Sequence, residues 1–151
     1  MAIKKHKELW NKLGSKKTRY FILTGGRGSG KSFEVGRFAS LLSFEQNHKI
    51  LFTRQTMTSA HLSIIPEFQE KIELLEVDKS FIINKSEIKN IKSNSDIIFR
   101  GIKTSSGDQT ANLKSLQGID TWILDEAEEL IDEQTFDKIN LSIRSSKHHN
   151  R

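Results

Sequence analysis

The sequence contains eight consecutive residues whose types and spacing suit a chain of phosphate groups. They read Gly25-Gly26-Arg27-Gly28-Ser29-Gly30-Lys31-Ser32 and fit the pattern G-x-x-x-x-G-K-[ST] in full. Glycines let backbone N–H groups approach phosphate oxygens because no Cβ stands in the way. Lys31 would place its charge on the β- and γ-phosphates, and the Ser32 hydroxyl suits Mg²⁺. The alternative is a glycine-rich turn that carries Lys-Ser by chance.

Two acids follow the apolar run Trp122-Ile123-Leu124. An acidic residue at the carboxyl end of a buried parallel strand lies on the ligand-binding edge of its sheet. We expect Asp125 to hold Mg²⁺ through its water shell, and Glu126 to orient and deprotonate the attacking water. Acids that only cap the next helix are the alternative. Glu128 and Glu129 read as solvated residues, although either one could replace Glu126.

Three arginines could act on the same phosphates. Arg27, inside the glycine loop, could reach the γ-phosphate as an arginine finger supplied in cis, or point to solvent or to a carboxylate. Arg54 ends an apolar run and could contact phosphate, hold an active-site carboxylate, or lie free on the surface. Arg100 is a weaker case of the same kind. The sequence leaves all three open.

The elements around the glycine loop form a βαβ pattern. The apolar run at 20–23 predicts a buried strand, apolar residues at helical spacing predict a helix over 32–46, and the run at 49–54 predicts a second strand. Strand, loop, helix and strand in this order imply a parallel sheet with a right-handed crossover. This context favours the phosphate-binding interpretation of the loop.

The rest of the chain predicts an α/β fold with helices on both faces of a mainly parallel sheet. Apolar spacing predicts a helix over 58–76, which Pro66 either starts or kinks. Short β runs separated by turn residues predict a small antiparallel meander around residues 80–100. A polar loop, a strand and a last helix then follow, at 103–112, at 121–124 and from the N-cap Asp132.

Composition narrows the class of protein without naming a function. The chain has 151 residues, a formal net charge of +5, 35% hydrophobic residues and no cysteine. We expect one domain. The lack of cysteine excludes disulfides, thiolate metal sites and cysteine nucleophiles. The sequence contains neither a 20-residue apolar run nor a signal peptide, so no membrane is expected. The positive charge favours nucleic acid as a partner.

Aromatic and histidine residues give weaker signals. Trp10 and Tyr20 could flank an adenine, but packing in the core is the simpler interpretation of both. The five histidines lack metal-ligand spacing with partner carboxylates.

In their order along the chain, these motifs resemble those of tailed-phage terminase large subunits of the PBSX-like branch. The resemblance rests on the glycine loop of residues 25–32, on Leu51-Phe52-Thr53-Arg54-Gln55-Thr56, on Ile98-Phe99-Arg100-Gly101, and on 113–118 followed by Trp122 to Glu128. It covers residues 18 to 145. The glycine loop alone occurs in many ATPases, whereas the ordered set is specific.

This resemblance implies a P-loop NTPase of the additional-strand, RecA-like class, using ATP and Mg²⁺. It implies ATP hydrolysis coupled to the movement of duplex DNA into a procapsid, in the cytoplasm of an infected bacterial host and not in the mature virion. The implied partners are duplex DNA, a small terminase subunit, a portal protein and further copies of the chain. The family also carries a C-terminal nuclease domain with an RNase H-like fold.

The sequence departs from the family by its length. We expect an N-terminal helix or arm over 1–17 and an ATPase core over 18–151, truncated before the strand with the coupling motif and without the nuclease domain. Such a chain could bind nucleotide and fail to hydrolyse it. Another P-loop DNA-dependent ATPase such as a helicase is a further alternative. The acids at 125–126 disfavour a small-molecule kinase, because a water-activating acid serves hydrolysis.

Overall fold

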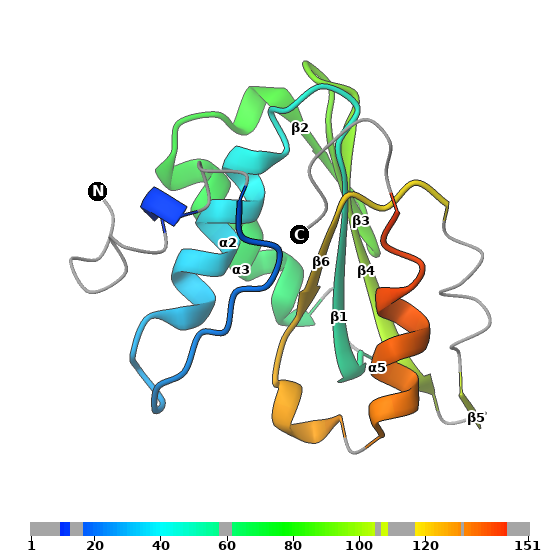
Figure 1. Cartoon of the computed structure of the whole chain (residues 1–151). Helices are drawn as coiled ribbons and strands as arrows, with labels where there is room; N and C mark the ends of the chain where they lie inside the picture. The colour runs from blue at the N-terminus through cyan, green and yellow to red at the C-terminus, as the bar shows by residue number, and fades with distance from the viewer. Residues whose placement is uncertain are drawn as a thin grey trace.

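The architecture is built on a mixed sheet whose strands come mainly from the middle of the chain (Figure 1). The computed structural model describes residues 10–12, 17–57, 62–104, 107–108, 117–130 and 132–144. Among these, six strands form one sheet in the order β2-β3-β4-β1-β6, with β5 paired to β4. The strands are β1 (Lys49–Thr56), β2 (Phe81–Ile83), β3 (Glu87–Asn90), β4 (Ser95–Thr104), β5 (Gly107–Asp108) and β6 (Thr121–Leu124).

Three of these strands are parallel and form the centre of the sheet. Strand β1 pairs with β4 on one side and with β6 on the other, so that Leu51 lies between Ile98 and Trp122. Strands β2 and β3 extend the sheet beyond β4 as antiparallel neighbours. The predicted parallel core and the antiparallel meander around residues 80–100 are therefore both confirmed.

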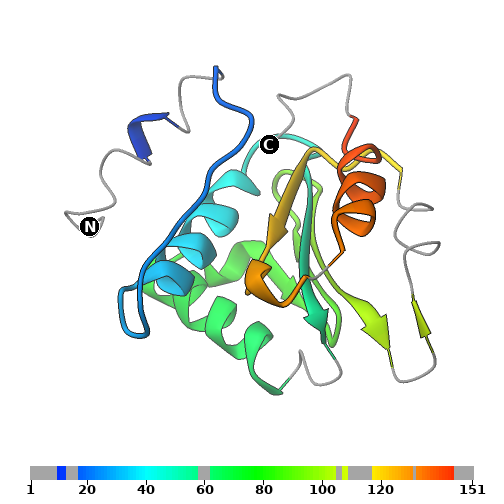
Figure 2. The ribbon, with the colours of Figure 1, turned by 60° about the horizontal axis from the view of Figure 1, so that its bottom comes forward.

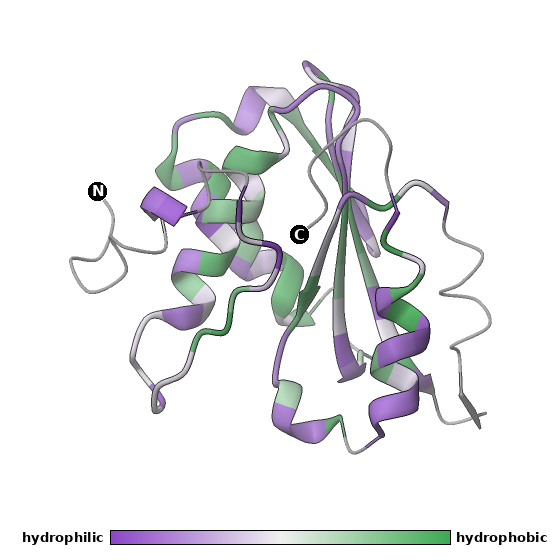
Figure 3. Ribbon diagram, in the orientation of Figure 1, coloured by the Kyte–Doolittle hydropathy of each residue, from purple (hydrophilic) through white to green (hydrophobic). Residues whose placement is uncertain are grey.

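Helices cover both faces of the parallel strands (Figure 2). Helices α2 (Lys31–Leu42) and α3 (Ile64–Leu74) pack on one face, over a core that includes Phe52, Phe68 and Phe99. Helix α5 (Glu133–Asn140) packs on the other face through Ile139. In Figure 3, green residues recur between purple ones along the helices, as expected for elements with one buried face. This arrangement confirms the predicted α/β class.

The helix boundaries follow the residues that begin helices. Helix α3 starts at Ile64, and Pro66 lies in its first turn, where a missing N–H costs nothing. Residues 58–61 of the predicted helix lie outside the described residues. Asp132 caps α5 as predicted, because its side chain accepts a hydrogen bond from the Gln134 amide. Hydrogen bonds from Thr135 and from the backbone lower the pKa of Asp132. Short 3₁₀ turns lie at Asp78–Ser80 and Ala127–Glu129.

The strand predicted at residues 20–23 does not form, and this prediction was wrong. Residues 17–26 carry no regular secondary structure, and Tyr20 and Ile22 are 56% and 88% exposed. An apolar run becomes a strand only beside a neighbour that satisfies its backbone groups. Both sides of β1 are taken by β4 and β6, and residues 20–23 do not pair with the open side of β6 either. The segment of residues 17–26 therefore runs extended outside the sheet, so the first strand of the predicted βαβ unit is missing from the described part of the chain.

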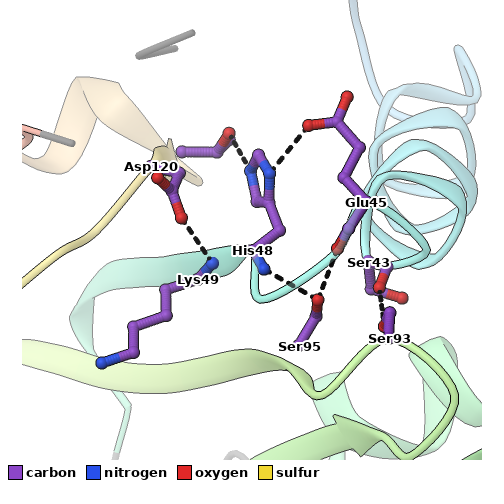
Figure 4. A network of polar contacts seen from close by, with 8 residues as sticks. Ser43, Glu45, His48, Lys49, Ser93, Ser95 and Asp120 are labelled. Carbon is purple, nitrogen blue, oxygen red and sulfur yellow. Dashed lines mark hydrogen bonds and ion pairs between the residues drawn. The ribbon is translucent and has the colours of Figure 1, made fainter. Parts of the chain in front are cut away.

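A buried polar network fixes the amino ends of the parallel strands (Figure 4). His48 lies between Glu45 Oε2 and Thr121 Oγ1, each 2.9 Å from one ring nitrogen. Asp120 Oδ2 accepts a hydrogen bond from the Lys49 amide at 2.8 Å. Ser95 Oγ accepts one from the His48 amide. These bonds tie β1 to β4 and β6 at the end of the sheet where β1 begins.

We expect the chain to self-associate as its concentration rises. Ile22 is 88% exposed on a segment that lies outside the sheet, and β6 has only β1 as its neighbour within the described sheet. Unpaired extended backbone is a template for pairing with another chain. Sedimentation velocity over a concentration series measures the effect. Ile22→Lys should reduce the association, and Ile91→Lys, at an exposed position in the turn after β3, should leave it unchanged. A single monomeric species for the unmodified chain at every concentration would contradict this expectation.

Candidate nucleotide-binding site

The acids of residues 125–126 lie at the carboxyl ends of the parallel strands, and the glycine loop lies at the same end of the molecule, at the start of α2 (Figure 1). The loop runs directly into α2, whose first residue is Lys31. The acids directly follow β6, which ends at Leu124. Carboxyl ends of parallel strands and helix amino termini are where α/β proteins bind phosphate-containing ligands. The structure therefore brings two motifs, about 95 positions apart in the sequence, to one edge of the sheet.

The backbone of the loop depends on its glycines. Gly25, Gly28 and Gly30 have φ angles of 146°, 73° and 83°, which other residues adopt only at a cost. A Cβ added at Gly25 would also meet Ser29 Oγ at 3.0 Å. Lys31 Nζ donates hydrogen bonds to the carbonyl of Gly25 and, at 3.3 Å, to that of Gly26. The ammonium group thus lies over the loop that would hold the phosphates.

The two acids differ in their surroundings. The Asp125 amide donates to the Thr53 carbonyl at 2.9 Å, which carries the β1–β6 pairing one residue past the strand. Its side chain is 27% exposed, against 44% for Glu126. Glu126 has left-handed backbone, with φ 52°, and begins the 3₁₀ turn of Ala127–Glu129. This conformation is uncommon for a residue with a side chain and gives the chain a sharp bend directly after Asp125.

Arg54 contacts both acids from β1. Its Nη2 donates to Asp125 Oδ2 at 2.5 Å, and its Nε lies 3.2 Å from Glu126 Oε2. Burial alone would lower the pKa of Arg54, but the hydrogen bond to Asp125 and the charges of Asp125, Glu126 and Glu129 raise it. The guanidinium therefore stays charged and neutralises part of the acidic cluster.

One small pocket is lined by one residue of each motif, Ser32 and Asp125. Its lining residues come from the start of α2, from β1, from α3 and from the segment after β6: Ser32, Val35, Phe52, Arg54, Ile64, Glu67, Phe68 and Asp125. Ser32 and Asp125, the two predicted metal-binding residues, thus share one pocket. A hydroxyl, a carboxylate and phosphate oxygens are the hard ligands that Mg²⁺ takes. Among the described residues, no three or more His, Asp or Glu side chains cluster in a way that could hold a metal ion, so phosphate and water would have to supply the remaining ligands.

Glu67 was not predicted as part of the site. It lies in the first turn of α3 and lines the pocket together with Ser32 and Asp125. In the sequence it is one of many acids in amphipathic helices. Glu67 reaches the pocket because α3 packs against β1, and no pattern in the sequence predicts this contact.

The other predicted residues lie apart from this pocket. Arg27 is exposed in the turn of the glycine loop, and Glu128 and Glu129 are exposed after β6. Arg100 Nη1 donates to the carbonyls of Phe99 and Ser86, so it is held on backbone groups.

The two aromatic side chains considered for adenine also have other partners. Trp10 packs edge-on against Phe38 of α2, and its indole N–H donates to Glu34 Oε2 at 2.8 Å. Tyr20 is exposed, and its hydroxyl lies 3.3 Å from Asn140 Oδ1. The expected core packing is therefore seen in part for Trp10, which packs on Phe38, and is not seen for Tyr20, which is exposed.

The site and sheet together define an α/β protein of the P-loop class. The family model described as "Phage terminase large subunit" matches residues 17–151. The chain therefore belongs to the phage terminase large subunit family. Among curated proteins, the terminase large subunit of Bacillus phage SPP1 is 29% identical over 112 residues, which cover 73% of this chain and 25% of that protein.

Two solved structures share the fold. The large terminase of bacteriophage HK97 has a TM-score of 0.70 at 15% identity, over 94% of this chain and 30% of that one. The large terminase of a thermophilic bacteriophage has a TM-score of 0.67 at 10% identity, over 89% of this chain and 33% of that one. The chain thus spans about a quarter to a third of the length of these relatives.

Proposed function

We propose that this chain is the nucleotide-binding part of a viral DNA-packaging motor, and that it binds ATP with Mg²⁺ and hydrolyses it. The observation that carries the proposal is the pocket shared by Ser32, the last residue of the glycine loop, and Asp125, directly after β6. Membership of the terminase large subunit family supports the assignment to DNA packaging. The predicted partners and the predicted action in the cytoplasm of an infected bacterial host rest on the family alone.

Each residue would have a distinct part in hydrolysis. Backbone N–H groups of residues 25–32 would wrap the phosphates, and Lys31 would neutralise the β- and γ-phosphate oxygens. Ser32 and Asp125 would hold Mg²⁺, which when bound stabilises charge on the transferred phosphoryl group. Glu126 would accept a proton at a carboxylate oxygen from the attacking water. Arg27, exposed in the loop, would be free to reach the γ-phosphate.

A second candidate function is nucleotide binding without turnover. It is favoured by the segment of residues 17–26, which leads into the glycine loop but lies outside the sheet. A loop whose preceding segment is not part of the sheet is held less firmly, and catalysis depends on position more steeply than binding does. Release of phosphate from ATP, measured alongside ADP binding, separates the two. Binding with turnover supports the motor domain, and binding without turnover supports the second function.

We also expect weak binding of duplex DNA that falls steeply with salt. The formal net charge is +5, and contacts between lysine or arginine and phosphate release counterions. Dissociation constants of about 1–100 µM near physiological salt are typical of such binding. Fluorescence anisotropy with two unrelated duplexes at several salt concentrations tests this. Tight, salt-insensitive or sequence-selective binding would contradict it.

The structure offers a separate observation about membranes. Among the described residues, no helix has both the length and the apolar character needed to cross a bilayer.

A further inference from the structure

One side chain of β1 bridges the two acids that follow β6. Arg54 Nη2 lies 2.5 Å from Asp125 Oδ2, and Arg54 Nε lies 3.2 Å from Glu126 Oε2. Adjacent carboxylates repel one another, and a guanidinium that contacts both offsets part of this repulsion. The bridge joins the acid predicted to hold metal to the acid predicted to activate water.

The sheet fixes the location of this bridge. Thr53, the residue before Arg54, accepts the Asp125 amide on its carbonyl and the Trp122 indole N–H on its hydroxyl, at 2.9 and 2.8 Å. These bonds hold the end of β1 against the end of β6 through both the backbone and the side chain of Thr53. The hydrogen bonds of Thr53 therefore hold the backbone of Arg54 beside the two acids.

The bridge is complete toward Asp125 and incomplete toward Glu126. The contact between Arg54 Nε and Glu126 lacks hydrogen-bond geometry, and Nε is buried with no hydrogen bond to any of the described residues. A buried donor without a partner is costly, and a small rotation of the Glu126 carboxylate would satisfy it. Arg54 also donates to one oxygen, Oδ2, of the Asp125 carboxylate, and Asp125 lines the same pocket as Ser32.

We propose that Arg54 is a positioning residue that restrains Asp125 in the metal-free site and holds Glu126 once Asp125 has turned to the metal. This role rests on the proposed ATP–Mg²⁺ site. Arg54 then competes with the metal for one carboxylate while it orients the other. A guanidinium suits this role because its planar fork can serve two acceptors at fixed angles, which the single ammonium group of lysine cannot.

The test measures how strongly ADP binding depends on the metal. Isothermal titration calorimetry gives the affinity for ADP with Mn²⁺ and without it, and the first divided by the second is the metal ratio. Arg54→Gln removes the competing charge, so this ratio should rise roughly tenfold, as expected for the loss of one adjacent opposite charge. Metal-free ADP affinity should stay within about twofold, because Arg54 contacts acids and not the glycine loop. A residue that merely supported the fold would lower the ratio, since Asp125 would be misplaced.

Arg54→Lys separates charge from orientation. It should keep the ratio near that of the unmodified chain, because a positive charge remains beside Asp125. Turnover should still fall roughly 10- to 100-fold, because one ammonium group cannot hold Glu126 as well. Arg100→Gln is the matched control: its side chain is bound to backbone carbonyls, so both readings should stay unchanged.

The outcomes separate this inference from the proposed function. A higher ratio for Arg54→Gln, with a normal ratio and lower turnover for Arg54→Lys, supports the positioning role. ADP binding with an unchanged or lower ratio for Arg54→Gln overturns that role and leaves the nucleotide site intact. No ADP binding by the unmodified chain overturns the proposed function and this inference together. Circular dichroism melts show whether each variant folds. If Arg54→Gln does not fold, the metal ratio and the turnover of Arg54→Lys are the test of the positioning role.

Discussion

Replacing Lys31 with alanine is expected to abolish measurable nucleotide binding and to leave the fold intact. The ammonium group lies on the carbonyls of Gly25 and Gly26, over the loop that would hold the phosphates. Hydrogen bonds to charged groups contribute about 1.5–3 kcal/mol each, so losing two phosphate contacts weakens binding roughly 100-fold or more. Titration with a fluorescent ADP in the presence of Mg²⁺ measures the change.

Lys49→Ala is the matched control for this experiment. Lys49 is an exposed lysine that begins β1, at the opposite end of the strand from the pocket. Its replacement should leave the affinity unchanged. A thermal melt should show similar stability for both variants. Equal affinity of Lys31→Ala and the unmodified chain would mean that the glycine loop does not bind the phosphates.

The second large effect is expected for Glu126→Gln, which should retain ATP–Mg²⁺ binding and lose hydrolysis. The amide has nearly the shape of the carboxylate but cannot take a proton from water. General-base catalysis contributes about 10²–10⁴-fold, so phosphate release should fall by that factor wherever the unmodified protein turns over. Single-turnover phosphate release, with ADP affinity measured in parallel, separates chemistry from binding.

If this expectation fails, two further variants identify which acid acts as the general base. Glu128→Gln and Glu129→Gln alter exposed acids on the 3₁₀ turn after Glu126. Both should keep the turnover of the unmodified protein. If Glu126→Gln keeps full turnover while one of these loses it, the base is the other acid and the assignment of Glu126 is wrong.

Local patterns predicted most of the fold. The glycine loop, the helix after it and the strand at 121–124 each have a signal within a few residues, and the structure places all three as expected. The meander around residues 80–100 followed from short β runs between turns. Asp132 followed from the preference for acceptors at helix N-caps. Such features depend on neighbours in the sequence, so a single sequence is enough to predict them.

The apolar run at 20–23 shows where this reasoning fails. Its residues suit a buried strand, but a strand also needs a partner for its backbone groups, and within the described sheet this run pairs with neither β1 nor the open side of β6. Pairing is a property of the whole sheet, so the sequence pattern of one segment cannot predict it.

The arrangement of the site depends on contacts between distant positions. Arg54 and Asp125 are 71 residues apart in the sequence, and Glu67 reaches the pocket only because α3 packs against β1. Residue types left three possibilities open for Arg54: a contact with phosphate, a contact with a carboxylate, or a free position on the surface. The parallel register of β1 and β6 is what brings it to Asp125 and Glu126. Long-range pairing of this kind has no local signature.

The central claim is that the glycine loop and the acids after β6 form one ATP–Mg²⁺ site. Backbone amide NMR shifts on adding Mg²⁺ with a non-hydrolysable ATP analogue test it most directly. The largest shifts are predicted at residues 25–32, with a second group at Asp125 and Glu126 that needs the metal. Shifts centred elsewhere, or none at saturating nucleotide, would contradict the claim.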